Sequence, residues 1–104
     1  MNIIATTILE QLGGRRFIAM TGSKNFVYSS TEPTWLSMHL TRNKARAQFL
    51  KIELMWTDTY TMTFSKVTGK KYHEKLETIK VIEGVYNDML QDIFTEVTGL
   101  YTTL

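Results

Sequence analysis

Apolar residues recur at helical spacing near the C-terminal end of the chain, and this repeat limits the folds open to it. The repeat consists of Ile82, Val85, Tyr86, Met89, Leu90, Ile93, Phe94 and Val97. Spacings of three and four residues predict an amphipathic helix over residues 82–99. A helix with one wide apolar stripe needs a second apolar surface to cover it.

Strand-like alternation supplies that second surface. In residues 49–56 every second residue, beginning with Leu50 and Ile52, is apolar. Residues 60–65 alternate large apolar residues with Thr or Ser. With Asp58 between them, these two segments predict an antiparallel hairpin. Further strands are predicted at 34–40, with an inward set of Leu36, Met38 and Leu40, and at 72–80.

The N-terminal part of the chain predicts a short helix followed by a strand. Residues 3–12 have helical spacing and end at Gly13-Gly14, a favoured pair for a helix end. Residues 15–21 alternate about Phe17 and predict a strand that ends in a turn at 22–25. The polar segments 26–33 and 42–46 predict a loop and a connection.

Together these elements predict one α+β domain over residues 1–104: a short N-terminal helix, an antiparallel sheet of four to five strands, and a C-terminal amphipathic helix packed on one face. The predicted core consists of Leu9, Leu12, Ile18, Leu36, Leu50, Ile52, Leu54, Met62, Phe64, Val85, Met89, Ile93 and Phe94.

The sequence offers little for catalysis or metal binding. It has no cysteine, and its two histidines, His39 and His73, have no ligand-like spacing. Gly22-Ser23-Lys24 lacks the upstream glycine of a phosphate-binding loop. Glu53 and Asp58 are the only carboxylates near the predicted hairpin, and no nucleophile motif accompanies them. We therefore expect no enzymatic activity, cofactor or metal.

The charges are divided unevenly along a chain whose net charge is only +2. Up to residue 71 there are ten Lys or Arg against four Asp or Glu, and from residue 72 there are two against six. The cations lie among aromatic residues, a combination that binds phosphates and stacks on bases. A solvated half-buried sheet has the same composition, so this alternative stays open. The predicted nucleic-acid-binding residues are Arg15, Arg16, Lys24, Arg42, Lys44, Arg46 and Lys51.

A protein partner is the alternative to nucleic acid. Asp88, Asp92 and Glu96 recur at four-residue spacing on the predicted last helix, and an apolar end of Leu100, Tyr101 and Leu104 follows. These residues predict a surface for docking to a host factor or an assembly partner. Self-association through the apolar end or a sheet edge is a third possibility.

Several short motifs point to a known group of proteins. They are Leu12-Gly13-Gly14, RFIAMTG at 16–22, Lys24-Asn25-Phe26, Asp58-Thr59-Tyr60 and YNDMLQDIFTEVTGLYTTL at 86–104. Over nearly its whole length the chain resembles small hypothetical proteins encoded by bacteriophages and mobile elements. The resemblance implies an accessory protein that binds nucleic acid or a host protein, and it brings no site residues.

The sequence also predicts a cellular location. The first residues have no basic segment of the kind that begins a secretion signal, and no apolar run approaches the length of a membrane span. We expect a cytoplasmic protein in the host cell, with no membrane partner.

Overall fold

A computed structural model describes residues 1–70 and 72–102 of the chain. Its elements in chain order are the helices α1 (Ile3–Leu12) and α2 (Gly14–Thr21), the strands β1 (Lys24–Tyr28), β2 (Trp35–His39), β3 (Phe49–Leu54), β4 (Tyr60–Thr68) and β5 (Lys75–Val85), the short 3₁₀ helix η1 (Asn87–Met89) and the helix α3 (Leu90–Thr98). The five strands form one antiparallel sheet in the order β1-β2-β3-β4-β5. The predicted α+β class is confirmed, with an N-terminal and a C-terminal helix packed on the sheet.

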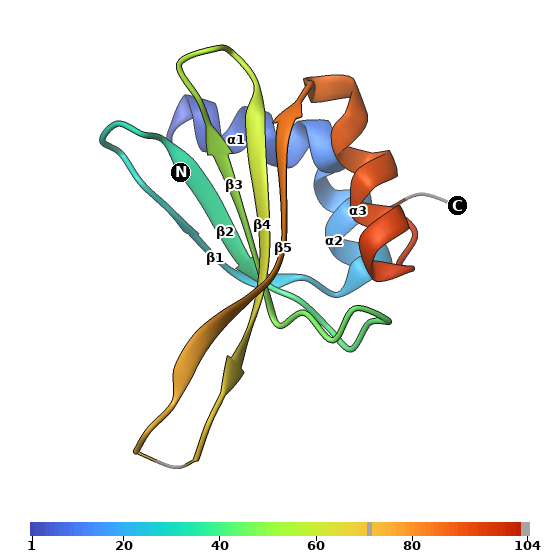
Figure 1. The fold of residues 1–104 in the computed structure, drawn as a ribbon. Helices are drawn as coiled ribbons and strands as arrows, with labels where there is room; N and C mark the ends of the chain where they lie inside the picture. Colours follow the sequence, from blue (N-terminus) through green and yellow to red (C-terminus); the bar gives the residue numbers. More distant parts are fainter. Residues whose placement is uncertain (71, 103–104) are drawn as a thin grey trace.

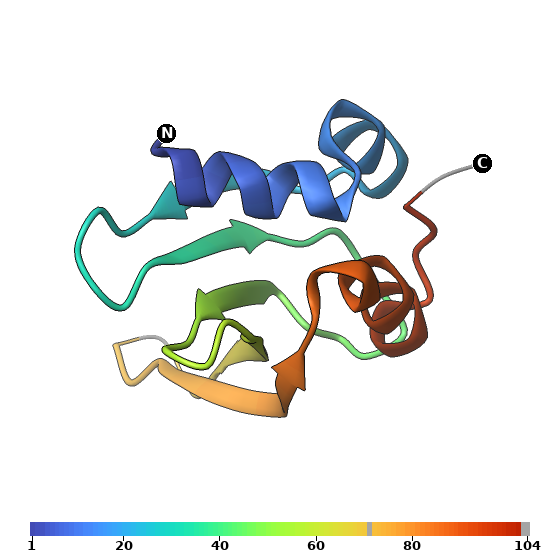
Figure 2. The same ribbon diagram turned by 90° about the horizontal axis from the view of Figure 1, so that it is seen from above.

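All three α-helices lie on the same side of the sheet (Figures 1 and 2). The core forms between them and the strands, where the ring of Phe17 from α2 meets that of Phe94 from α3 edge to face at 5.0 Å. Such aromatic pairs add about 0.5–1.5 kcal/mol to the effect of burial. The fully buried large side chains are Ile8, Leu12, Phe17, Leu36, Met38, Leu50, Ile52, Met62, Phe64, Val85, Leu90 and Phe94.

The predicted hairpin of residues 49–56 and 60–65 is confirmed as β3 and β4. Leu50 pairs with Phe64 and Ile52 with Met62, so all four side chains face the core. The predicted strand at 34–40 is confirmed as β2, and its inward set is buried. Trp56 does not continue β3, because the strand ends at Leu54 and the chain turns.

The strand predicted at residues 15–21 is wrong, because this segment forms α2. Gly13 and Gly14 have φ of +126° and +60°, which redirects the chain after α1 so that a second helix can start. Phe17 and Thr21, four residues apart, are both buried, and the Thr21 hydroxyl donates to the Phe17 carbonyl at 2.7 Å. Over so few residues, helical and strand periods select overlapping apolar positions.

The loop predicted at residues 26–33 is wrong in its first part, where β1 occupies Lys24–Tyr28. As an edge strand β1 needs few buried residues, and only Phe26 packs against the core. Asn25 has φ of +56°, and the pairing with β2 is irregular between Lys24 and Val27. This bulge disturbs the alternation of residues along β1, so the sequence does not predict a strand there.

The last helix is shorter than the predicted segment 82–99, because residues 82–85 belong to β5. Ile82 pairs with Met62 and Val85 with Tyr60, so one extra residue stands on β5 between these pairs. Gly84, with φ of +67°, lies in this bulge. Because of the bulge, Ile82 and Val85 lie on one face of the strand although they are three residues apart in the sequence. A spacing of three residues is also typical of one face of a helix.

Most of the predicted core is confirmed. Leu12, Leu36, Leu50, Ile52, Met62, Phe64, Val85 and Phe94 are buried, and Leu9, Ile18, Leu54 and Ile93 are partly buried against the same cluster. Met89 is wrong: it ends η1 and is 40% exposed, whereas its neighbour Leu90 is buried. The strand predicted at 72–80 occurs as β5, which begins at Lys75. None of the helices in the described residues is long and apolar enough to cross a membrane.

Candidate nucleic-acid interface

The side of the sheet opposite the helices forms the open face, which the pairing of the strands defines. Three rows of cross-strand partners run over β2, β3 and β4, and partners in a row point to the same side of the sheet. The rows are Trp35, Glu53 and Thr61; Ser37, Lys51 and Thr63; and His39, Phe49 and Ser65. The edge strand β1 adds Val27 beside Ser37 and Lys24 beside His39.

Two ring contacts characterise the open face. The ammonium of Lys51 lies 5.1 Å from the centroid of the Trp35 ring, within the range of a cation–π interaction. The rings of His39 and Phe49 stack at a centroid distance of 4.9 Å and an interplanar angle of 18°. All four residues are partly exposed, so solvent reaches these rings.

A groove of about 400 Å³ runs along the open face toward the β4–β5 hairpin. The outer half of that hairpin projects beyond the other strands (Figure 1). Apolar side chains dominate the groove, and several hydroxyl groups lie among them. Its lining residues are Trp35, Ser37, Phe49, Leu50, Lys51, Thr63, Ser65, Val67, Leu76 and Thr78.

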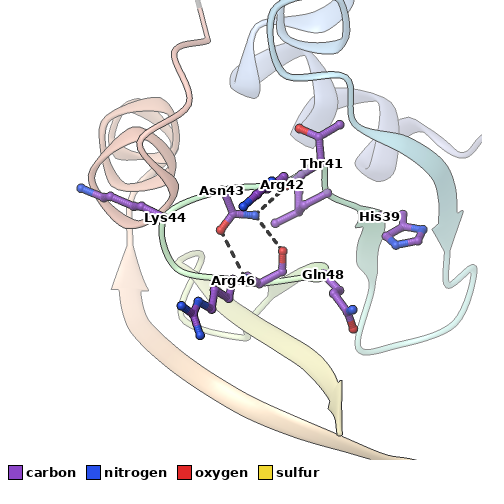
Figure 3. Close-up of a pocket in the computed structure, with 9 residues that line it drawn as sticks. His39, Thr41, Arg42, Asn43, Lys44, Arg46 and Gln48 are labelled. Atoms are coloured by element: carbon purple, nitrogen blue, oxygen red, sulfur yellow. Dashed lines mark hydrogen bonds between the residues drawn. The ribbon is translucent and has the colours of Figure 1, made fainter.

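The connection between β2 and β3, residues 40–48, adjoins the end of the open face at His39 and Phe49, and its order depends on Asn43 (Figure 3). The Asn43 amide donates to the carbonyls of Thr41 at 2.8 Å and Ala47 at 2.7 Å. Its oxygen accepts from the backbone N–H of Ala45 at 3.1 Å and of Ala47 at 3.2 Å. One side chain therefore closes the loop from inside.

The same loop is attached to both neighbouring helices. The Thr41 hydroxyl donates to the Thr21 carbonyl at 2.6 Å, and the Lys44 backbone N–H donates to the Thr98 carbonyl at 3.1 Å. Gly22, which ends α2 with φ of +69°, lies so near that a Cβ there would stand 2.7 Å from Thr41 Cγ2. The ends of α2 and α3 thus hold the loop beside the sheet.

The three cations of this loop do not converge on one point. The stem of Lys44 lies against Gly99, where an added Cβ would be 3.2 Å from its Cδ. Figure 3 shows Lys44 and Arg46 pointing in different directions from the loop. Arg42, Lys44 and Arg46 are all exposed, and all three line the hollow within the loop. Their arrangement suits contacts to several separated phosphates better than a single anion site.

The remaining predicted cations divide between the two sides of the molecule. Lys24 and Lys51 lie on the open face, as their partners His39 and Ser37 show. Arg15 and Arg16 are exposed on α2, in the helical layer, and do not join them. Phe49 and Lys51 share the face opposite Leu50 and Ile52, as the alternation in residues 49–56 implies.

The residues predicted for a protein partner are brought together only in part. Asp88 lies in η1, whereas Asp92 and Glu96 lie on α3, so they form no single helical ridge. Asp92, Glu96 and Tyr101 line one shallow hollow. Leu100 packs against the core, and the neighbouring Thr102 hydroxyl donates to Gln91 Oε1 at 3.2 Å. Leu104 lies outside the described residues.

One buried titratable group lies in the core rather than at the interface. Burial raises the pKa of Tyr60 above its ordinary value, and its hydroxyl donates to Gln11 Oε1 at 2.7 Å. Within residues 1–70 and 72–102 no group of three or more metal-ligating side chains comes together. His39 takes part in the ring stack, and His73 is exposed beside the β4–β5 turn.

The sequence predicts cations among aromatic residues but does not indicate which of them are neighbours in the fold. Trp35 and Lys51 lie on different strands, and their contact depends on the register of β2 against β3. Val67 and Leu76 line the groove because the β4–β5 hairpin extends beyond the other strands (Figure 1). Comparison with protein-family models, with curated proteins and with solved structures found no match for this chain.

Proposed function

We propose that this protein binds single-stranded nucleic acid on the open face of its sheet, as a non-enzymatic accessory protein of a bacteriophage or mobile element. The observation that carries the proposal is the pair of ring contacts on the sheet face that none of the described helices covers. Lys51 lies over Trp35, and His39 stacks on Phe49. The phage setting follows the resemblance described above.

The ring systems are suited to contacts with bases. Stacking of a base on an aromatic side chain contributes about 1–3 kcal/mol and tolerates any sequence, because every base has a flat face. Trp35 and His39 are four residues apart on β2, which separates them by about 13 Å at the usual rise of a strand. The two platforms would therefore receive different bases of one strand.

The cations are suited to contacts with the phosphates. Lys24 and Lys51 lie on the open face, and Arg42 and Arg46 extend the positive surface around the adjoining loop. Glu53, in the row of Trp35, lies toward the other end of the face and repels phosphate. The sugar–phosphate backbone of the bound nucleic acid would run near the β2–β3 loop, and its bases would point toward the sheet.

Duplex nucleic acid fits this surface poorly. The rings lie on the sheet itself, where only unpaired bases reach them, since the flat faces of paired bases are hidden in the stack. The described residues contain no helix on the open face that could enter a major groove. Hydroxyl groups of Ser37, Thr63 and Thr78 along the groove can form hydrogen bonds with base edges.

Fluorescence polarisation tests this proposal. Labelled oligothymidylate, oligouridylate and a duplex of the same length are titrated with the wild type at low and at physiological salt. We expect the single strands to bind more tightly than the duplex. The variant Arg42→Glu with Arg46→Glu should bind more weakly, with a salt slope shallower by about 1.4, since each phosphate contact contributes about 0.7.

The matched control is Arg15→Glu with Arg16→Glu, which changes the net charge equally but on α2. It should affect binding much less than the loop variant. Equal losses in the two variants would indicate a general charge effect and contradict the proposed interface, as would tighter binding of the duplex.

A further inference from the structure

The end of the sheet farthest from the β2–β3 loop has a different character. In an antiparallel sheet of this order, the β1–β2 and β3–β4 connections and the end of β5 meet at that end (Figure 1). Trp56, in the β3–β4 turn, is 92% exposed there. No other described tryptophan, tyrosine or phenylalanine is as exposed.

The turn that presents Trp56 is well bonded. The Met55 N–H donates to the Thr59 carbonyl at 2.8 Å, and the Asp58 N–H donates to the Met55 carbonyl at 3.0 Å. The hydroxyls of Thr57 and Thr59 are 2.8 Å apart. Trp56 thus stands on a structured turn, so binding through this side chain orders little additional backbone.

A hollow lies on each side of this turn. The hollow toward α1, of about 230 Å³, has mixed polar and apolar walls and is lined by Ile4, Glu32, Thr34, Leu54, Met55, Trp56 and Asp58. The hollow toward β5 is more polar and is lined by Met55, Trp56, Thr57, Thr59, Thr61, Glu83 and Gly84. Together they surround Trp56, and these residues form the Trp56 surface.

The charge of the Trp56 surface has one sign. Glu32, Asp58 and Glu83 are exposed, and no Lys or Arg among the described residues lines either hollow. This surface therefore repels a phosphate backbone and favours a cation. An arginine can stack on an indole ring and pair with a carboxylate, while an apolar neighbour enters the hollow against Ile4 and Leu54.

We propose that the Trp56 surface docks a basic segment of another protein that presents an arginine beside an apolar side chain. Tryptophan is among the residues that most often dominate binding energy at protein interfaces, particularly where a pocket adjoins it. This site meets the open face at Thr61 but contains neither of that face's ring contacts, so it does not depend on the proposed nucleic-acid binding.

Nuclear magnetic resonance of the ¹⁵N-labelled protein tests the docking site with defined probes. The probes are a short peptide of alternating arginine and leucine and a matched peptide with glutamine in place of arginine. We expect saturable shifts of the Trp56 indole N–H and of the amides of residues 55–59 and 83–84 with the arginine peptide only. Trp56→Ala should abolish the shifts of the remaining amides.

Charge variants sharpen this test. Asp58→Asn with Glu83→Gln should weaken the arginine peptide about threefold to tenfold, and asparagine tolerates the φ of +61° at position 58. Asp92→Asn with Glu96→Gln removes the same charge from α3 and should leave the affinity unchanged. Three results would overturn the proposal: equal binding of the two peptides, shifts confined to α3, or Trp56 shifts that follow protein concentration without peptide.

Discussion

Asn43 is the residue on which the order of the β2–β3 loop depends. Its side chain makes four hydrogen bonds with the backbone of the loop, two as donor and two as acceptor. Asn43→Ala leaves these backbone groups without partners and should lower the free energy of unfolding by about 1–3 kcal/mol. Urea denaturation measures this change. Arg42→Ala, at an exposed site in the same loop, should stay within about 0.5 kcal/mol of the wild type.

A destabilisation of Asn43→Ala no larger than that of Arg42→Ala would show that the loop does not need this side chain. The affinity of Asn43→Ala for single strands should fall as well, since Arg42 and Arg46 then lose their fixed positions.

Tyr60 links stability to pH at the residue scale. Burial raises the pKa of its phenol above the ordinary value of about 10, so the folded state favours the neutral form. This contribution is fully present below that ordinary value and is lost as the pH rises through the raised pKa. Tyr60→Phe cannot ionise, so between about pH 9 and pH 11 its free energy of unfolding should fall less than that of the wild type.

The two proteins should be compared by urea denaturation at each pH, because other groups titrate in the same range and cancel in the difference. Parallel curves for the wild type and Tyr60→Phe would contradict the raised pKa. At neutral pH the variant should be less stable by about 0.5–1.5 kcal/mol, through loss of the hydrogen bond to Gln11.

At the scale of elements, the last helix starts later in the structure, as α3 at Leu90, than the sequence-based prediction places it. Phe94 is fully buried against Phe17, and Phe94→Ala should lower the free energy of unfolding by about 3–5 kcal/mol. Met89 was predicted in the core but is 40% exposed in η1, so Met89→Ala should cost less than about 1 kcal/mol. Chemical denaturation of both variants checks the register; similar losses would favour the longer helix.

The elements that the sequence predicted best are those with regular pairing. Strands β3 and β4 pair from Phe49 to Leu54 without interruption, so their alternation is undisturbed. Strand β5 has a bulge at Gly84, and β1 is irregular after Lys24; the prediction failed at both. Each bulge shifts the alternation of side chains along the strand by one residue. Over a few residues, the shifted pattern cannot be told from that of a helix or a loop.

At the scale of the whole molecule, charge differs between the two ends of the sheet. Arg42, Lys44 and Arg46 lie in the β2–β3 loop, whereas Glu32, Asp58 and Glu83 surround Trp56 at the opposite end. The sequence indicated a basic first part and an acidic last part, but two of these three carboxylates come from the first part. Folding thus separates charge along the strands rather than along the chain.

The candidate interface could be predicted only in part for the same reason. Alternation alone indicates that Phe49 and Lys51 share a face, and this is confirmed. The contact of Lys51 with Trp35 requires the register of two strands, which the sequence does not contain. A strand at residues 15–21 would place Arg15 and Arg16 in the sheet with these residues, but the segment forms the helix α2, which removes them from the open face.

The most direct test of the open face uses the fluorescence of Trp35. The chain has two tryptophans, so Trp56→Phe leaves Trp35 as the only one. Titration of this variant with oligothymidylate should quench Trp35 emission and saturate at the affinity that polarisation gives, because a base stacks on the indole. Trp35 emission that stays unchanged throughout the titration would contradict single-strand binding on the open face.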